Sequence, residues 1–241
     1  MSSGGNSPYP LATGGMSPQG ATTVVRIHRP SADYGDKKVL CSAICKCKDE
    51  PKKGVNDQSL KQACVSGRLK QLDEIMAHRS PYKPEVNYDM TKEPPAPIMS
   101  SDVETKAHEW LPGWIKKWWN VPDESGGQRP SFKPLKGMVR RPDVVIVKDP
   151  SKPPTQDNIK QVVEIKFPPD TMDAPQREAY SQIAGDDDKL VEIGPEDCDC
   201  NQPDPDPSKL PVKELGAAAI AAQLLYMLLT KRPPPALVPA F

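Results

Sequence analysis

The fold is decided by the stretch Val139-Arg140-Arg141-Pro142-Asp143-Val144-Val145-Ile146-Val147 and, after a polar gap, Ile159-Lys160-Gln161-Val162-Val163-Glu164-Ile165-Lys166. Both runs are rich in β-branched residues, and the gap between them carries Pro, Asp and Asn. This pattern is typical of two strands joined by a hairpin-like loop. Antiparallel pairing places the start of the first strand beside the end of the second.

Three charged side chains lie where those two strand ends meet. Asp143 opens the first strand, and Glu164 and Lys166 are two residues apart on the second, so they leave the same face. Two carboxylates can hold Mg²⁺ and leave positions for water and a phosphate oxygen, and the lysine can orient that water. Alone, Glu-x-Lys is typical of a solvent-exposed sheet face. Together with Asp143 it favours phosphodiester hydrolysis.

The same residues resemble a known family. Pro142-Asp143 followed by Glu164-Ile165-Lys166 resembles the PD-(D/E)XK nuclease signature, and Asp173-Ala174-Pro175-Gln176 is similar to the glutamine helix of its VRR-NUC branch. The resemblance covers residues 100–195 and implies an α+β or α/β fold with an αβββαβ restriction-endonuclease-like core. It also implies dependence on Mg²⁺ or Mn²⁺ and cleavage of DNA.

The resemblance implies a set of site residues as well. Asp143, Glu164 and the backbone carbonyl of Ile165 are the expected metal ligands, joined by a glutamate from the helix before the sheet. Lys166 and Gln176 complete the expected catalytic set. Ser101 and Glu104 form a capping-box pattern that predicts this helix over residues 101–110. Glu104 is the first choice for the glutamate and Glu109 the second, with a purely capping role as the alternative for Glu104.

Basic side chains gather in the approach to Asp143, although the formal net charge of the chain is zero. This distribution is what a phosphate backbone requires. Four tryptophans near residues 110–119 are more typical of a core than of a base-stacking platform. The residues expected to contact DNA are Arg140, Arg141, Lys116, Lys117 and Tyr180, with helix-surface packing as the alternative for Tyr180 and for Gln176.

The 241-residue chain is long enough for one domain with appendages. A strand is predicted at 22–27 and a helix at 57–78, a helix at 173–183 ends at Gly185, and a strand follows at 189–193. The predicted regions are a disordered 1–20, a cysteine-containing adaptor or decoration at 21–80, a proline-rich linker at 81–99, a nuclease domain at 100–200, and a spacer, apolar helix and proline-rich tail at 201–241.

The apolar helix predicted at 215–229 is expected to pack against the nuclease domain. Docking to a chaperone or an immunity protein is the alternative. Its length, about 15 residues, is short of the roughly 20 needed to cross a bilayer, so no stable membrane insertion is expected.

Six cysteines occupy positions 41, 45, 47, 64, 198 and 200. We interpret them as free, partly buried thiols. A zinc site at the first four is an alternative, although their spacing departs from the paired arrangement of zinc ligands. Disulfides are a second alternative, should the protein reach an oxidising compartment.

The first residues lack the basic n-region and apolar core of a signal peptide, so we expect synthesis in a bacterial cytoplasm without one.

Three functions are compatible with the features of the sequence. The extended N-terminal half makes the chain similar to antibacterial nuclease effectors of type VI secretion systems. That similarity implies delivery into a target-cell cytoplasm, a cognate immunity protein, and a secretion apparatus or chaperone as partners. The alternatives are a repair or phage-type nuclease of the same chemistry and a non-catalytic DNA-binding or adaptor module.

Overall fold

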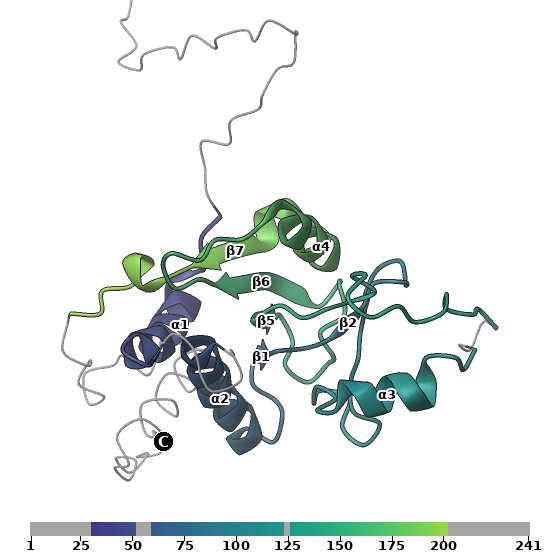
Figure 1. The fold of residues 1–241 in the computed structure, drawn as a ribbon. Helices are drawn as coiled ribbons and strands as arrows, with labels where there is room; N and C mark the ends of the chain where they lie inside the picture. Colours follow the sequence, from purple (N-terminus) through teal and green to yellow (C-terminus); the bar gives the residue numbers. More distant parts are fainter. Residues whose placement is uncertain (1–29, 52–58, 123–125, 202–241) are drawn as a thin grey trace, which may run out of the picture.

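The structure, a computed structural model, describes residues 30–51, 59–122 and 126–201 (Figure 1). The described chain is α+β, with four helices and a mixed sheet. The strand predicted at 22–27, the helix at 215–229 and the disorder predicted for 1–20 lie outside the described residues. In chain order the helices and strands are α1 (Tyr34–Cys47), α2 (Leu60–Ile75), β1 (Tyr82–Pro84), β2 (Tyr88–Asp89), β3 (Ala96–Pro97), α3 (Leu111–Trp118), β4 (Val139–Arg140), β5 (Val144–Val147), β6 (Ile159–Ile165), α4 (Ala174–Ala184) and β7 (Leu190–Ile193), with short 3-10 turns η1 (Asp187–Lys189) and η2 (Pro195–Asp197).

The main sheet has four strands in the order β1-β5-β6-β7. β5 runs antiparallel to both β1 and β6, whereas β7 runs parallel to β6. The predicted hairpin is confirmed, with Val144 opposite Val163. Its first run is divided in two, because Pro142 offers no backbone N–H for a strand ladder. Before that proline, β4 joins a second sheet of order β3-β2-β4.

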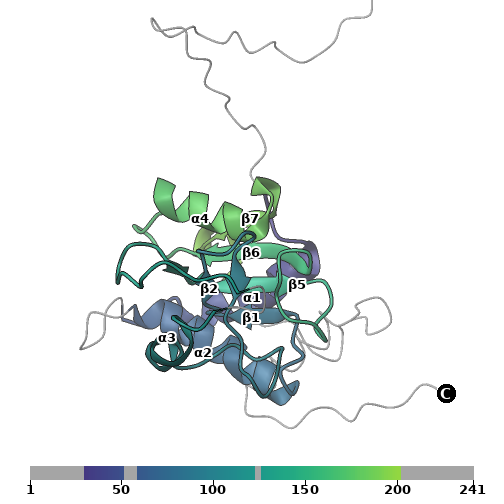
Figure 2. The ribbon, with the colours of Figure 1, turned by 90° about the vertical axis from the view of Figure 1, so that its right-hand side faces the viewer.

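Helices cover both faces of the main sheet, which explains why its strands are continuous apolar runs. Along β5, Val144 and Ile146 pack with α1 and α2, while Val145 and Val147 pack with α4. Figures 1 and 2 show α1 and α2 on one side of the sheet and α4 on the other. The chain passes through these layers in the order α1, α2, β1, β5, β6, α4, β7, with β2, β3, α3 and β4 inserted between β1 and β5.

The N-terminal region belongs to this same core. The helix predicted at 57–78 is confirmed as α2, which the Ser59 hydroxyl caps by accepting a hydrogen bond from the N–H of Gln62. The linker predicted at 81–99 is wrong, since that segment contains β1, β2 and β3. Its prolines are tolerated because Pro84 and Pro97 lie on edge strands, where a missing N–H leaves no ladder bond unmade. Residues 21–80 are therefore not a separate adaptor where the structure describes them.

The helix predicted at 101–110 is wrong. These residues form turns and an isolated bridge between Met99 and Ala107, and the helix begins at Leu111 instead. Pro112 explains the shift, because proline suits the first turn of a helix and disrupts an interior. By contrast, α4 and β7 are confirmed. Asp173 caps α4 by accepting the N–H of Gln176 at 2.7 Å, and Gly185 ends it with a left-handed φ of 73°.

All six cysteines form disulfides, so the free-thiol interpretation and the zinc alternative are both wrong. The pairs are Cys41–Cys198, Cys45–Cys200 and Cys47–Cys64. Cys41 and Cys45 lie one turn apart on α1, so both face the segment that follows β7. Separately, no helix in the described part of the chain is long and apolar enough to cross a membrane.

Candidate active site

Asp143, Glu164 and Lys166 come together at one end of the β5–β6 hairpin. The Lys166 Nζ lies 2.8 Å from Glu164 Oε1, so the two side chains share a face, as the spacing predicts. The Ile165 N–H, between them, donates to Asp143 Oδ2 at 2.8 Å. Residues 143 and 164 face α4, because their strand neighbours Val145 and Val162 pack in the α4 cluster.

Gln176, in the first turn of α4, closes this group. Its Nε2 donates to Glu164 Oε1 at 2.7 Å, and its Oε1 accepts from Lys166 Nζ at 3.1 Å. Tyr180, one turn further on, donates its hydroxyl to the carbonyl of Arg141 at 2.9 Å and contacts Gln176 Nε2 at 3.2 Å. Tyr180 is only 4% exposed, which favours the packing alternative over a contact with DNA. The Tyr180 hydroxyl orients the Gln176 amide through its contact with Nε2.

A row of four carboxylates crosses the sheet through this group. Glu164 lies opposite Glu192 of β7, and the β5–β6 register places Asp143 opposite Glu164. On the other side the N–H of Glu85, which follows β1, donates to the Asp143 carbonyl at 3.0 Å. Glu85 holds a left-handed φ of 51°, a costly conformation for a residue with a side chain. The row is therefore Glu85, just after β1, Asp143, just before β5, Glu164 in β6 and Glu192 in β7.

Cations neutralise three members of this row. Glu85 pairs with Lys70 and, at 3.8 Å, with Arg141. Glu164 pairs with Lys166, and Glu192 with Arg177 at 3.0 Å. Among the described residues, Asp143 forms no salt bridge.

The pKa values follow from this arrangement. Burial, and then the Glu164 carboxylate, raise the pKa of Asp143 well above its usual range. Burial also raises the pKa of Glu164, although Lys166 opposes the shift. The pKa of Glu85 is lowered despite its burial, because Lys70 and Arg141 stabilise its charge. Among the described residues, Asp143 is thus the carboxylate of the row that lacks a paired cation, whereas Glu164 is paired with Lys166.

The residues present fit a divalent cation. Glu164 is 2% exposed, and its Oε2 is buried without a hydrogen-bond partner among the described residues. One or two carboxylates completed by water and phosphate oxygens are the usual protein ligands of Mg²⁺. The described residues contain no group of three or more His, Cys, Asp or Glu side chains placed to hold a metal. Asp143 and Glu164 are therefore the two side chains that would hold the ion.

The Ile165 carbonyl, the expected backbone ligand, accepts a hydrogen bond from Gln62 Nε2 at 3.0 Å. A carbonyl oxygen has a second lone pair, so this bond leaves room for another partner. Gln62 belongs to α2, the helix that actually precedes the sheet. Sequence reasoning missed both Gln62 and Glu85, because each reaches the site through tertiary packing and neither belongs to a motif.

Glu104 and Glu109 do not take the place expected for a glutamate ligand. Neither lies in the helix before the sheet, since residues 101–110 are not helical. Glu104 is exposed in a turn, and Glu109 pairs with Lys106 at 2.7 Å. α2 instead presents an amide, that of Gln62, to the site.

The basic residues expected to contact DNA are divided between two places. Arg141 lies at the site, joined to it through the Tyr180 hydroxyl, and Arg140 is half-buried in β4. Lys116 and Lys117 are exposed on α3, which Figure 1 shows beyond the second sheet. Of the four tryptophans, Trp119 is buried as expected, whereas Trp110 is 67% exposed.

Replacement of Asp143 by Asn is expected to stabilise the metal-free protein at neutral and alkaline pH. The folded pKa of Asp143 lies above its unfolded value, about 4, so the folded protein retains a proton that the unfolded chain has released. Stability of the wild type therefore falls as the pH rises from the unfolded pKa through the folded one. Asn at position 143 keeps an oxygen that accepts the Ile165 N–H, and because it does not titrate it removes this loss of stability at high pH.

Thermal unfolding in EDTA, followed between about pH 5 and pH 9, measures this effect. The difference in Tm between Asp143→Asn and the wild type should grow with pH. Asp149→Asn, at an exposed carboxylate, is the matched control and should not show that growth. Parallel Tm curves for Asp143→Asn and the wild type would contradict the raised pKa of Asp143 in the folded protein.

Comparison of the chain with models of protein families, with curated proteins and with solved structures finds no match. The site consists of the half-buried Asp143 and the buried Glu164, the Lys166 ammonium beside Glu164, and the Gln176 amide that contacts both Glu164 and Lys166.

Proposed function

We propose that this chain is a metal-dependent deoxyribonuclease with a PD-(D/E)XK-type core, similar to the VRR-NUC branch, that hydrolyses DNA with Mg²⁺ or Mn²⁺. The observation that carries the proposal is the hydrogen bonding of the two carboxylate oxygens of Glu164. Its Oε1 accepts hydrogen bonds from Lys166 and Gln176, while its Oε2 is buried and has no hydrogen-bond partner in the part of the chain that the structure describes. When α1 and the insertion of β2, β3, α3 and β4 between β1 and β5 are set aside, the remaining order α2, β1, β5, β6, α4, β7 is helix, three strands, helix, strand, as the resemblance implies, and this supports the proposal.

Each residue has a role in this proposal. A bound cation would acidify water and offset charge on the phosphate. Asp143 and Glu164 hold that cation. The Lys166 ammonium, fixed by Glu164 and Gln176, donates to the attacking water or to the phosphate oxygen on which charge develops. The Gln176 amide orients the Lys166 and Glu164 side chains by hydrogen bonds to both, and Tyr180 orients Gln176 through its own contact with the amide.

The wider role within this proposal is that of an antibacterial toxin. Three disulfides favour a protein that passes through an oxidising compartment over a nuclease that resides in a reducing cytoplasm. The similarity to type VI secretion effectors implies DNA, a cognate immunity protein and a secretion apparatus or chaperone as the partners. Synthesis in the producing cell and action in the target-cell cytoplasm belong to the same proposal.

Plasmid digestion tests the nuclease. The purified oxidised protein is incubated with supercoiled plasmid in Mg²⁺, in Mn²⁺, and in EDTA. Nicked or linear product is expected with either metal and none with EDTA. Intact plasmid at every metal concentration would reject the nuclease assignment.

A growth assay tests the toxin role. Induced expression, in a bacterial host whose cytoplasm allows disulfide formation, should arrest growth when the chain is intact. Glu164→Gln removes a metal-binding charge with little change in size, so cells that express it to the same level should grow. Normal growth with the intact chain, at an expression level confirmed by blotting, would remove the toxin role while leaving the plasmid result to decide the chemistry.

A further inference from the structure

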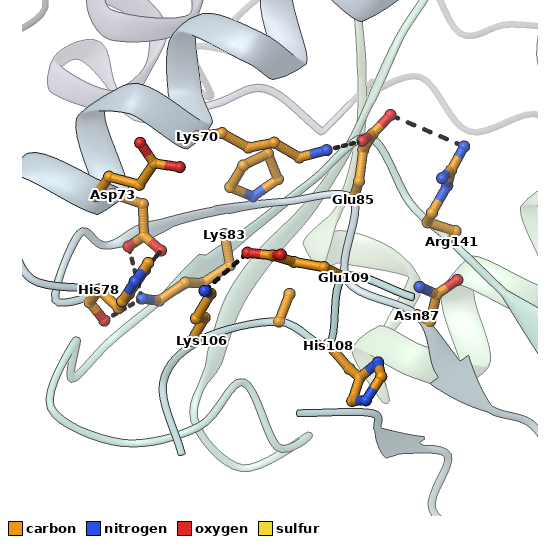
Figure 3. Close-up of a pocket in the computed structure, with 13 residues that line it drawn as sticks. Lys70, Asp73, His78, Lys83, Glu85, Asn87, Lys106, His108, Glu109 and Arg141 are labelled. Atoms are coloured by element: carbon orange, nitrogen blue, oxygen red, sulfur yellow. Dashed lines mark hydrogen bonds and ion pairs between the residues drawn. The ribbon is translucent and has the colours of Figure 1, made fainter. Parts of the chain in front are cut away.

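A pocket of about 380 Å³ lies beside the carboxylate row (Figure 3). It is formed by the second half of α2, the end of β1 and residues 106–109. None of the four central residues, Asp143, Glu164, Lys166 and Gln176, lines it. Its volume is within the range of sites that bind small molecules, roughly 300–1,000 Å³. The pocket is therefore large enough for a nucleoside and distinct from the metal site.

Two residues join the pocket to the metal site. Glu85 lines the pocket and is also the member of the carboxylate row next to Asp143. Arg141 lines it too, and its carbonyl accepts the Tyr180 hydroxyl on the active-site side. Glu85 is two strands away from Glu164, a separation of about 10 Å. An extended nucleic-acid strand with a phosphate at the carboxylates therefore reaches the pocket with its neighbouring nucleotide.

The pocket wall carries cations and carboxylates in pairs. Lys83 is 1% exposed, and its Nζ donates to Asp73 Oδ1 at 2.8 Å and to the His78 carbonyl at 2.7 Å. On another wall Lys106 pairs with Glu109 at 2.7 Å. Figure 3 shows these pairs around the pocket.

This wall does not suit a bare anion, because its lysines are already neutralised by carboxylates. It offers hydrogen-bond donors and acceptors side by side, together with the Asn87 amide, the His108 imidazole, and the apolar Pro84 and Ala107. The edge of a nucleobase has the same mixture of donors and acceptors, and its faces are flat and apolar. Arg141, 56% exposed and 3.8 Å from Glu85, stands between the two sites, where the connecting phosphate would lie.

We infer that the pocket receives one unpaired nucleotide of the DNA strand that is cut, so that single-stranded or locally unpaired DNA is the preferred substrate. This inference rests on the proposed nuclease function. A base cannot enter a pocket while it is paired and stacked, so duplex DNA must first be opened there. Single-stranded DNA does not bear that cost.

The test compares binding and cleavage of a labelled single-stranded oligonucleotide and of the same strand in a duplex. Binding is measured by fluorescence anisotropy with Ca²⁺ in a Lys166→Ala background, and cleavage with Mg²⁺ in the active protein. Both are expected to favour the single strand by about tenfold or more. Ala107→Leu fills the pocket, and Glu109→Ala removes an exposed acceptor without disturbing the core; both should reduce the preference. Asp102→Asn, an exposed carboxylate on the same segment that does not line the pocket, is the matched control and should keep it.

Two results would overturn the inference. One is equal binding and cleavage of single-stranded and duplex DNA. The other is a preference that survives in both Ala107→Leu and Glu109→Ala. A protein that cuts no oligonucleotide, yet binds the single strand in a pocket-dependent way, would refute the nuclease and retain the pocket as a DNA-binding site. A protein that cuts both substrates equally would retain the nuclease and refute the pocket.

Discussion

Replacement of Lys166 by alanine is expected to lower the rate of plasmid cleavage by about 10²- to 10³-fold, the usual effect of removing one donor aimed at a developing charge. The Lys166 Nζ is held by Glu164 and Gln176, so no other described cation can take its position without rearrangement. The rate is measured as the initial loss of supercoiled plasmid in Mg²⁺. DNA affinity should change much less, because a single phosphate-directed charge is lost.

The matched control is Lys152→Ala, which removes a lysine that is 69% exposed on the loop between β5 and β6. Its cleavage rate should equal that of the wild type. Gln176→Ala serves as a second variant, because it keeps the charges of Lys166 and Glu164 but removes the amide that orients the two side chains. It should slow cleavage less than Lys166→Ala does. Unchanged nicking by a folded Lys166→Ala protein would contradict the catalytic role of Lys166.

Removal of both long-range disulfides is expected to cost about 4–5 kcal/mol of stability, whereas removal of either one alone should cost far less. Cys41–Cys198 and Cys45–Cys200 span 157 and 155 residues, so they close nearly the same loop in the unfolded chain. Once one is formed, the second closes only a very small additional loop. Their contributions are therefore strongly non-additive.

Urea unfolding of three variants measures this coupling. Cys41→Ser with Cys198→Ser, Cys45→Ser with Cys200→Ser, and the combination of all four are compared with the wild type. The four-fold variant should lose much more than the sum of the other two. Additive losses would show that the two bonds act by local packing and not through the shared loop. Cys47–Cys64, which spans 17 residues, gives an independent reference of about 3 kcal/mol.

The sequence predicts well those parts of the fold that depend on short patterns of neighbouring residues. The β5–β6 hairpin follows from two β-branched runs, and α4 follows from its Asp173 cap and Gly185 terminus. The cluster of Asp143, Glu164 and Lys166 is foreseeable for the same reason, since a single hairpin brings it together. Gln176 is foreseeable from the start of α4, which fixes its distance from the strand ends.

The parts that sequence does not predict depend on contacts between distant segments. β1 has three residues and ends in proline, so only its pairing with β5 marks it as a strand. Glu85 and Gln62 reach the site because β1 and α2 pack there. The disulfide partners are more than 150 residues apart in two of three pairs, and six cysteines permit many pairings. Glu104 was misplaced because a capping-box pattern cannot show whether the turn it starts continues as a helix.

The bond between Cys45 and Cys200 also determines how the molecule bears mechanical load. The described chain ends at residue 201, directly after this bond, and β7 lies a few residues before it. A pull from the C-terminal side is therefore transmitted covalently into α1, and the hydrogen bonds that join β7 to β6 are spared. Because Glu192 and Glu164 occupy that ladder, traction on the tail of an oxidised molecule, as in passage through a narrow channel, would leave the carboxylate row undistorted.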